Sequence, residues 1–326
     1  MIQTCKFLMA SAALLIMAAC GPATTEPNNA DLANVDATAI TAEAIHATAL
    51  VLDAHADIEI PGKESRYVGT DGLSKVAPDK MRAGGVDAVV MSVAVGPGPR
   101  DADGYAVARA LADEKLGAVK ALVADPNNNL VLARSADELV QAHADSKGAL
   151  ILGLQNARIL GTEVSALDDF YAAGVRVFAL THMGHNDFAD SSRPIYNSAV
   201  GAHEIEAEHG GLSALGRLAI QRINALGGIN DISQLSKAAA LQVLALSTTP
   251  VIASHSNVWH LSNVSRNLTD EEIDLIGKNG GVIHIAPFRG YLFDSSNKEL
   301  DGLIRVARRE AGIEEDYYYP FELYWE

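Results

Sequence analysis

Short apolar runs that alternate with longer helical patterns constrain the fold of this 326-residue chain more than any other feature. Each run is nearly continuous in Val, Ile, Leu and Ala, as in strands that are buried on both faces. Strands of this kind, joined through helices, form parallel sheets. The runs cover residues 49–54, 86–95, 149–154, 175–180, 228–232, 250–254 and 280–286.

Helical patterns fill the intervals between these runs, for example at residues 104–123, 136–143, 211–226 and 269–279. The last pattern opens with NLTDEE, which places acidic residues in the first turn of a helix. Seven strand–helix units predict a TIM-like (β/α)8 barrel, in which an eighth strand closes the sheet. Residues 310–326 are acidic and aromatic without a strand pattern, so we expect a barrel that lacks its last strand.

The N-terminal residues resemble a bacterial export signal. Lys6 precedes an apolar stretch, and small residues precede Cys20, as in a lipobox whose cysteine is lipidated. The polar residues after Cys20 are rich in Pro, Thr and Asn, which is typical of a flexible tether. We expect a signal peptide at 1–19, a lipid-anchor tether at 20–44 and the barrel domain at 45–326. The alternative is an ordinary secretory signal with an incidental cysteine.

The charge balance limits the partners of the chain. The formal net charge is −16 and the sequence pI is about 5.0, whereas phosphate binding needs clustered Lys and Arg. Nucleic acid is therefore excluded as a partner. No stretch after the signal reaches the roughly 18 apolar residues of a membrane span. We expect a periplasm-facing lipoprotein of the bacterial envelope that contacts the membrane only through its lipid anchor.

Polar side chains occur where several of the apolar runs end. In LDAHAD at 52–57, alternation places Asp53, His55 and Asp57 on one face of a strand. A histidine and a carboxylate two residues apart can both reach one divalent ion. His182 and His255 follow two other runs. A single histidine at such a place is more often a hydrogen-bonded core residue, but three at one barrel mouth favour a metal site.

Several longer segments resemble the renal (membrane) dipeptidase family, and the similarity extends over residues 45–312. Besides LDAHAD, the matching segments are MRAGGVDAVVMSV at 81–93, LTHMGHNDFADSS at 180–192, GLSALGR at 211–217 and PVIASHSNVWHLSNVSRNL at 250–268. The resemblance implies a barrel of the metal-dependent hydrolase type, an amidohydrolase-like metallopeptidase with one or two zinc ions and a dipeptide or small amide as substrate. A homodimer is an open alternative to a monomer.

The resemblance also implies a set of metal ligands, from which this sequence departs at two positions. His55 and Asp57 would bind the first zinc ion, and His255 would bind the second. The metal-bridging glutamate of the family falls at Gln155, and its other second-site histidine falls at Gln234. Because an amide oxygen is a much poorer zinc ligand than a carboxylate or an imidazole, we expect the second site to be weak.

Other roles follow from the resemblance by position. His182 would stabilise the developing oxyanion, Arg266 would bind the free carboxylate of the dipeptide, and Asp53 would orient the ligands on its strand. The histidines His185, His203 and His209 lie in the long polar loop after the fourth run, where we expect solvated side chains.

Two functions fit these features. The first is metal-dependent hydrolysis of dipeptides by a metal-activated water, which makes the chain a metallodipeptidase. The second is a catalytically weak or inactive barrel lipoprotein that binds a small amino-acid-like ligand or assists envelope maturation. The two glutamines favour the second function, and the retained ligands favour the first.

The lipidation of Cys20 is testable by membrane fractionation. Cys20→Ala is expected to release the protein from the membrane fraction, because the lipidated cysteine is the predicted anchor. Cys5→Ala, inside the predicted signal, serves as the control and should leave the protein in the membrane fraction. A Cys20→Ala protein that still partitions with the membrane would contradict the prediction.

Overall fold

The structure is a computed structural model that describes residues 41–65, 67–197, 202–288, 291–292 and 298–310. Cys20 and the predicted signal peptide lie outside the described residues. The chain divides into two compact units, Met1–Thr48 and Ala49–Glu326. The described part of the first unit contains helix α1 (Ala42–Thr48). The second unit contains the sheet and the remaining helices.

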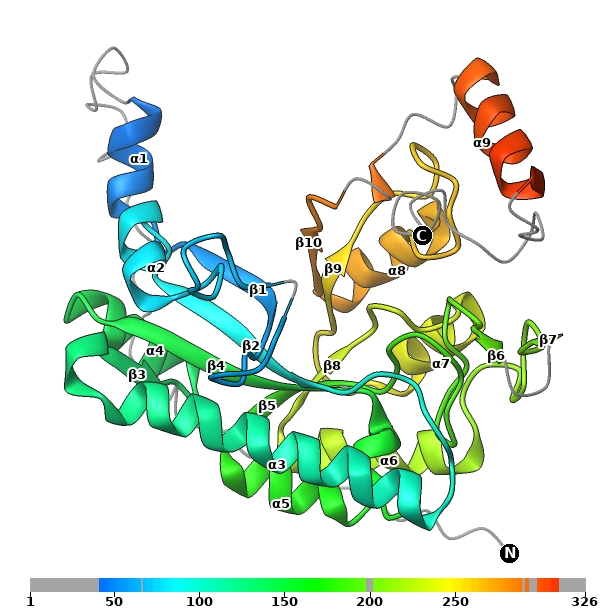
Figure 1. Cartoon of the computed structure of the whole chain (residues 1–326), viewed down its shortest axis with the longest axis horizontal. Helices are drawn as coiled ribbons and strands as arrows, with labels where there is room; N and C mark the ends of the chain where they lie inside the picture. Colours follow the sequence, from blue (N-terminus) through cyan, green and yellow to red (C-terminus); the bar gives the residue numbers. More distant parts are fainter. Residues whose placement is uncertain (1–40, 66, 198–201, 289–290, 293–297, 311–326) are drawn as a thin grey trace, which may run out of the picture. The chain divides into compact units, whose positions relative to one another are not determined.

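A parallel sheet of eight strands forms a nearly closed barrel in the second unit, which confirms the predicted (β/α)8 fold class (Figure 1). Its strand order is β1-β2-β4-β5-β8-β9-β10, and β3 pairs with β4 beside this path. Two further short strands, β6 and β7, form an antiparallel pair. The strands are β1 (Leu52–Asp57), β2 (Ala88–Ala94), β3 (Leu130–Leu132), β4 (Gly148–Gln155), β5 (Val175–Ala179), β6 (Tyr196–Asn197), β7 (Ala202–His203), β8 (Ile229–Asp231), β9 (Ile252–Ser256) and β10 (Val282–Ile285).

Each of the seven apolar runs overlaps a strand of the barrel path. The clearest case is β2, in which every residue is buried, as expected of a strand covered on both faces. The largest difference concerns β1, which begins at Leu52 rather than at residue 49. LDAHAD is therefore the strand itself, and its pairing with β2 shifts register between Asp53 and Ala56. Strand β3, with three residues, is too short to give a periodic signal.

Helices pack against the outer side of the strands, and Figure 1 shows α3, α5 and α6 along β2, β4 and β5. The predicted start of the last helical pattern is confirmed, because Thr269 caps α8 through a capping box with Glu272. None of the helices in the described ranges is long and apolar enough to cross a membrane. They are α2 (Pro78–Gly84), α3 (Ala102–Ala124), α4 (Ala136–Ala144), α5 (Ala166–Ala173), α6 (Ala214–Leu226), α7 (Lys237–Leu246), α8 (Asp270–Asn279), α9 (Lys298–Glu310) and the 3₁₀ turns η2 (Pro126–Asn128) and η3 (Ala157–Leu160).

The strands β1 and β10 are the two ends of the sheet path within the described residues. On β10, Val282 and Ile285 leave 52% and 58% of their surface exposed, although both are apolar. Residues 310–326, which lack a strand pattern in the sequence, lie almost entirely outside the described residues. The structure therefore describes a barrel that is open between β1 and β10.

Helix α6 approaches the loop after β5 so closely that one position must be glycine. A Cβ atom on Gly216 would lie 2.0 Å from the carbonyl oxygen of Phe188. Gly216→Ala is expected to destabilise the protein by about 1–3 kcal/mol in urea unfolding, because the helix and the loop must separate. The matched control is Gly117→Ala in the exposed part of α3, where an added Cβ meets nothing within 4 Å. That variant should gain about 0.5–1 kcal/mol. Equal effects of both substitutions would contradict the close packing.

Candidate active site

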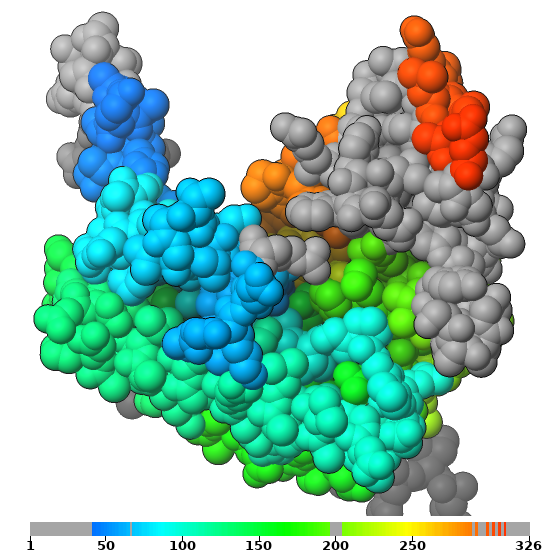
Figure 2. All heavy atoms as spheres, in the orientation of Figure 1, coloured from blue at the N-terminus to red at the C-terminus, as the bar shows by residue number. Residues whose placement is uncertain are grey.

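A cavity of about 780 Å³ lies at the carboxyl ends of the barrel strands. It is lined by β1, by the end of β4, by β9 and β10, and by the loops after β5 and β8. In Figure 2 the surface is hollowed between the blue residues of β1 and its following loop and the orange residues of β10. A mouth of this kind is where parallel barrels place their reactive groups.

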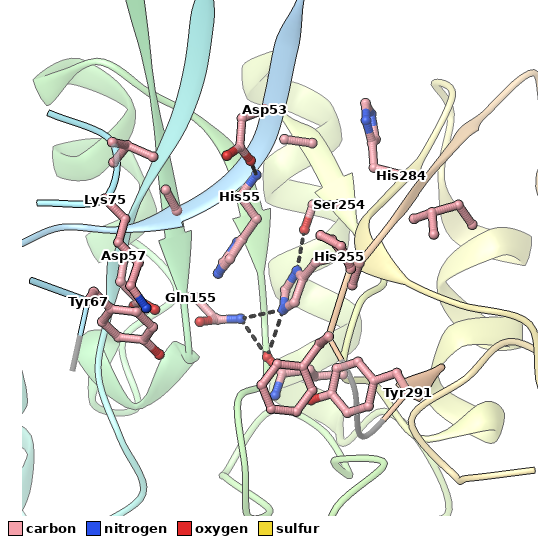
Figure 3. A pocket seen from close by; sticks show the side chains of 18 of the residues that line it. Asp53, His55, Asp57, Tyr67, Lys75, Gln155, Ser254, His255, His284 and Tyr291 are labelled. Carbon is pink, nitrogen blue, oxygen red and sulfur yellow. Dashed lines mark hydrogen bonds between the residues drawn. The ribbon is translucent and has the colours of Figure 1, made fainter. Parts of the chain in front are cut away.

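Two histidines from strands that are far apart in the sheet order, β1 and β9, meet in this cavity. The imidazole rings of His55 on β1 and His255 on β9 are stacked, with centroids 3.8 Å apart and an interplanar angle of 19° (Figure 3). The carboxylate of Asp231, the last residue of β8, joins them. One donor atom from each of these three residues lies within 4.8 Å of the other two. Three donors so close together can bind one metal ion.

Burial keeps both stacked rings neutral. It lowers the pKa of His55, although the nearby Asp57 carboxylate acts in the opposite direction. Burial also lowers the pKa of His255 well below the usual value, and the adjacent His55 and Arg266 add to this effect. Neutral imidazoles have the lone pair that a metal ligand needs, so the electrostatics of the site favour ligation.

A chain of hydrogen bonds fixes the orientation of His255. The Ser254 hydroxyl lies 2.5 Å from Asp231 Oδ2 and 2.7 Å from His255 Nδ1. Because Asp231 also accepts from the Ser254 amide, we assign the hydroxyl proton to the bond with the carboxylate. The hydroxyl oxygen then accepts the proton on Nδ1, and Nε2 of His255 carries a lone pair that faces the cavity.

Two glutamines lie beside that lone pair. Gln155 Nε2 donates to Gln234 Oε1 over 2.6 Å and lies 3.4 Å from His255 Nε2. Gln234 Oε1 lies 3.2 Å from the same imidazole nitrogen (Figure 3). Both glutamines are buried, with 1% and 6% of their surface exposed. The two amides and the imidazole therefore form a closed polar cluster, which we call the amide–imidazole cluster (Gln155, Gln234, His255).

The backbone that presents the glutamines has an unusual conformation. Gln234 has φ 69° and Asn156, directly after Gln155, has φ 80°. The left-handed region is unfavourable for such side chains unless neighbouring contacts enforce it. Here the Gln234 carbonyl accepts hydrogen bonds from the Thr181 hydroxyl over 2.8 Å and from the Ser192 amide over 2.9 Å. The tertiary structure thus holds the Gln234 backbone at the site.

His182 lies in the loop after β5 and lines the cavity. Burial lowers its pKa to about 4, against the opposing effect of Asp57, so the ring is neutral at pH 7. Its Nδ1 atom is buried without a hydrogen-bond partner. A neutral imidazole with one unused nitrogen is suited to contact a ligand, in agreement with the position expected from the sequence.

Of the other predicted site residues, Asp53 and Asp57 line the cavity and Arg266 does not. Asp53 accepts a hydrogen bond from the His55 amide over 3.0 Å, and its role in orienting the ligands stays a prediction. Asp57 lines the cavity but is not part of the three-donor group, and in Figure 3 it lies on the side of Lys75 and Tyr67. Arg266 is 2% exposed and is not among the residues that line the cavity.

The loop histidines correct the sequence interpretation. His185 is 6% exposed, accepts from the Ser191 amide over 3.0 Å and contacts the Ile205 carbonyl over 2.7 Å. The expectation of a solvated side chain is wrong for His185, because backbone groups of the loop need a buried partner. His209 is half-buried and contacts the Asn186 carbonyl over 2.8 Å.

Sequence reasoning missed Asp231, Ser254 and Arg193, which all belong to the site. Asp231 is the last residue of β8 and lies inside the fifth apolar run, so a search for carboxylates near the ends of the runs would have found it. Ser254 has no signal of its own, because its role depends on Asp231 lying beside β9. Arg193 lies in a loop without periodicity, although it lines the cavity.

These donors fit one metal ion better than two. His55, His255 and Asp231 offer two imidazoles and a carboxylate, a ligand set that suits zinc. Gln155 presents an amide nitrogen, which has no lone pair for a metal, and Gln234 presents an oxygen already bonded to that amide. A second ion would have to break the amide–imidazole cluster, so the residues do not fit a two-ion centre.

Fold and site together are those of a parallel barrel with a candidate metal site at its mouth. The sequence pattern of the membrane dipeptidase family (Peptidase family M19) matches residues 40–314, and the chain belongs to this family. Among its relatives, dipeptidase aclJ of Aspergillus oryzae is 32% identical over 149 residues, which are 46% of this chain and 33% of that protein. Human dipeptidase 3 is 29% identical over 214 residues, 66% of this chain and 41% of that protein.

Solved structures agree with this assignment. The probable dipeptidase PvdM from Pseudomonas aeruginosa has a TM-score of 0.73 and 32% identity, and the match covers 83% of this chain and 68% of that one. A metallopeptidase from Rhodobacter sphaeroides bound to a phosphinate mimic of L-Ala-D-Ala has a TM-score of 0.61 and 20% identity over 74% of this chain and 75% of that one, and shares the fold. The chain spans between a third and a half of the length of the first curated dipeptidases it matches.

The lowered pKa of His182 predicts an acid-sensitive site. In the unfolded chain the histidine protonates near pH 6.5, whereas in the folded chain it stays neutral down to about pH 4. His182 therefore does not reduce the free energy of unfolding above pH 6.5, and it lowers that free energy progressively as the pH falls from 6.5 toward 4. Urea unfolding at pH 7 and pH 5 gives the free energy of unfolding that is lost between the two pH values. This loss should be about 2 kcal/mol smaller in His182→Gln than in the wild type.

The measurement uses chelator-treated protein, because a bound cation would change the protonation of neighbouring histidines. The control is His260→Gln, whose side chain is 75% exposed, and it should show the pH dependence of the wild type. An unchanged pH dependence in His182→Gln would contradict the burial of this ring.

Proposed function

We propose that this protein hydrolyses dipeptides at the mouth of its barrel with the help of one zinc ion. The observation that carries the proposal is the group formed by His55, His255 and Asp231, whose donor atoms lie within 4.8 Å of one another in a cavity of about 780 Å³. Membership of the membrane dipeptidase family supports a dipeptide as the substrate. The L-Ala-D-Ala mimic in the Rhodobacter sphaeroides structure suggests small peptides with that type of backbone.

The metal would be held by His55 on β1 and His255 on β9, with Asp231 as the carboxylate ligand. Asp57, which lies two residues after His55, would complete the set implied by the family. When bound, the ion would supply Lewis-acid chemistry to the scissile carbonyl group. Ser254 would keep Nδ1 of His255 occupied by a hydrogen bond, so that its Nε2 remains available as a ligand atom.

The remaining residues of the cavity bind and orient the peptide. His182 is neutral and has an unpartnered buried nitrogen, so its N–H can donate to the oxygen on which negative charge develops. Gln155 lies where the family has a carboxylate, and an amide does not accept a proton from the attacking water. We therefore expect slow turnover.

A second function is favoured by the amide–imidazole cluster. Because the side-chain amides of Gln155 and Gln234 form a hydrogen bond of 2.6 Å with each other, they do not need a second ion as a partner. Such a cavity suits a protein that binds an amino-acid-like molecule without cleaving it.

In either case we propose that the protein acts in the bacterial envelope, facing the periplasm and anchored through Cys20.

Replacing both glutamines separates the two functions. Gln155→Glu with Gln234→His introduces a carboxylate and an imidazole at the second metal position. Metal analysis after dialysis should give at most one equivalent for the wild type and two for the double variant. Hydrolysis of L-Ala-D-Ala should rise by roughly 10²–10⁴-fold, since a carboxylate can accept the proton from water.

The control is Gln242→Glu on α7, a glutamine that does not line the cavity. It should change neither metal content nor hydrolysis. A double variant that gains metal without turnover, while the wild type binds a ligand that the variant rejects, would refute the dipeptidase proposal and support the binding function. Two ions retained by the wild type through a chelator challenge would refute the one-ion site.

A further inference from the structure

The amide–imidazole cluster has two polar atoms that its own hydrogen bonds do not use. The bond between its two amides joins Gln155 Nε2 to Gln234 Oε1. The other polar atom of each amide, Gln155 Oε1 and Gln234 Nε2, has no hydrogen-bond partner within the described part of the chain. Both side chains line the cavity. The cluster therefore offers one hydrogen-bond acceptor and one donor to a ligand.

The imidazole of His255 determines which atom of each amide is unused. Its Nδ1–H donates to the Ser254 hydroxyl, so its Nε2 has a lone pair. Only the NH2 end of the Gln155 amide can donate both to this lone pair, over 3.4 Å, and to Gln234 Oε1, over 2.6 Å. The carbonyl oxygen of Gln155 then points away from His255, toward the side of the cavity where Asp57 lies (Figure 3). The orientation of both amides thus follows from the tautomer of one histidine.

Buried hydrogen bonds hold the backbone of Gln155 in place. The next residue, Asn156, is 2% exposed, and its Nδ2 donates to the carbonyl groups of Val95 and Gly96 over 3.2 and 3.3 Å. Its Oδ1 accepts from the Asn186 side chain over 3.0 Å. These bonds connect the end of β4 to the loops after β2 and β5. Gln155 therefore has a fixed position before any ligand binds.

The backbone of Gln234 is fixed in a similar way. The buried Thr181 hydroxyl and the Ser192 amide donate to its carbonyl over 2.8 and 2.9 Å, and they hold its left-handed conformation at φ 69°. The side chain is 6% exposed, so its surroundings restrict the rotamers that it can adopt. A ligand that bonds to both amides therefore does not have to order them first.

We propose that the amide–imidazole cluster binds an uncharged carboxamide group of a ligand, at the position where the resemblance to the dipeptidase family implies a second metal ion. A primary carboxamide donates through its NH2 group to Gln155 Oε1 and accepts through its oxygen from Gln234 Nε2. A carboxylate has no proton for the first atom, and an ammonium group has no lone pair for the second. Either charged group would leave one buried atom of the cluster unpaired, which weakens binding.

The cavity has room for a ligand of this class. Its volume of about 780 Å³ lies within the range of roughly 300–1,000 Å³ that small-molecule sites occupy. The ligand would be an amino acid or a short peptide with a primary amide at the end of a side chain or at its C-terminus. Binding of this kind goes beyond dipeptide hydrolysis, because the contact needs neither a bound metal ion nor the cleavage of a bond.

Three amino acids of equal side-chain length test the contact. L-Glutamine, L-glutamate and L-ornithine end in a carboxamide, a carboxylate and an ammonium group. Calorimetry on the whole chain as purified gives the three dissociation constants. The wild type should bind L-glutamine roughly 10- to 100-fold more tightly than either of the others, because only the carboxamide satisfies both glutamines of the cluster.

Two substitutions should reverse this preference. Gln155→Glu removes the NH2 group that bonds to Gln234, so the Gln234 amide turns its own NH2 group toward the new carboxylate. The cluster then presents only acceptors, and L-ornithine should bind more tightly than L-glutamine. Gln234→Glu removes the unused donor directly and should have the same effect. The control is Gln221→Glu, which introduces the same charge at an exposed position on α6 and should keep the order of the wild type.

Two results would overturn carboxamide binding. One is a wild type that binds L-glutamate or L-ornithine as tightly as L-glutamine, or that binds none of the three. The other is a preference for L-glutamine that persists in both Gln155→Glu and Gln234→Glu. Hydrolysis of L-Ala-D-Ala is measured in the same preparations. Its absence would refute the proposed dipeptidase function alone, so the two failures are distinguishable.

Discussion

The buried carboxylate of Asp231 connects strands β8 and β9 at the site. Asp231 is 3% exposed, and its oxygens accept hydrogen bonds from the Ser233 amide, the Ser254 amide and the Ser254 hydroxyl. A buried charge is tolerated only with such partners. Strands β8 and β9 share a single register pair, Asp231 with Ile252, so the side chain of Asp231 supplies contacts that the strand ladder does not. The position of His255 follows from this arrangement.

The amide–imidazole cluster connects β4, the loop after β8 and β9 through uncharged polar groups. The resemblance to the dipeptidase family implies a glutamate and a histidine at these two positions, and two glutamines offer a second ion one negative charge and one imidazole less. The two amides instead satisfy each other and contact His255. Because a polar cluster of this kind leaves few unsatisfied groups, the mouth remains an ordered site with fewer charges.

The loop from Thr181 to Arg193 is as much a part of the scaffold as the strands. Asn186 and Asp190 are buried and bond to backbone groups within the loop and in the following segment. Helix α6 packs on the Phe188 carbonyl where Gly216 has no side chain. Buried hydrogen bonds therefore fix the loop that brings His182 to the cavity.

The sequence by itself determined the fold class and most of the strands, because continuous apolar runs are the direct signature of doubly covered parallel strands. It also located His55, His182 and His255, since polar residues that follow such runs must lie at one barrel mouth. It could not find Ser254, because its role depends on contacts between segments that are distant in the chain. Only the tertiary structure decided that Gln155 and Gln234 bond to each other and that Arg266 is engaged by β9. Hydrogen bonds between side chains from different strands depend on distances that no local pattern records.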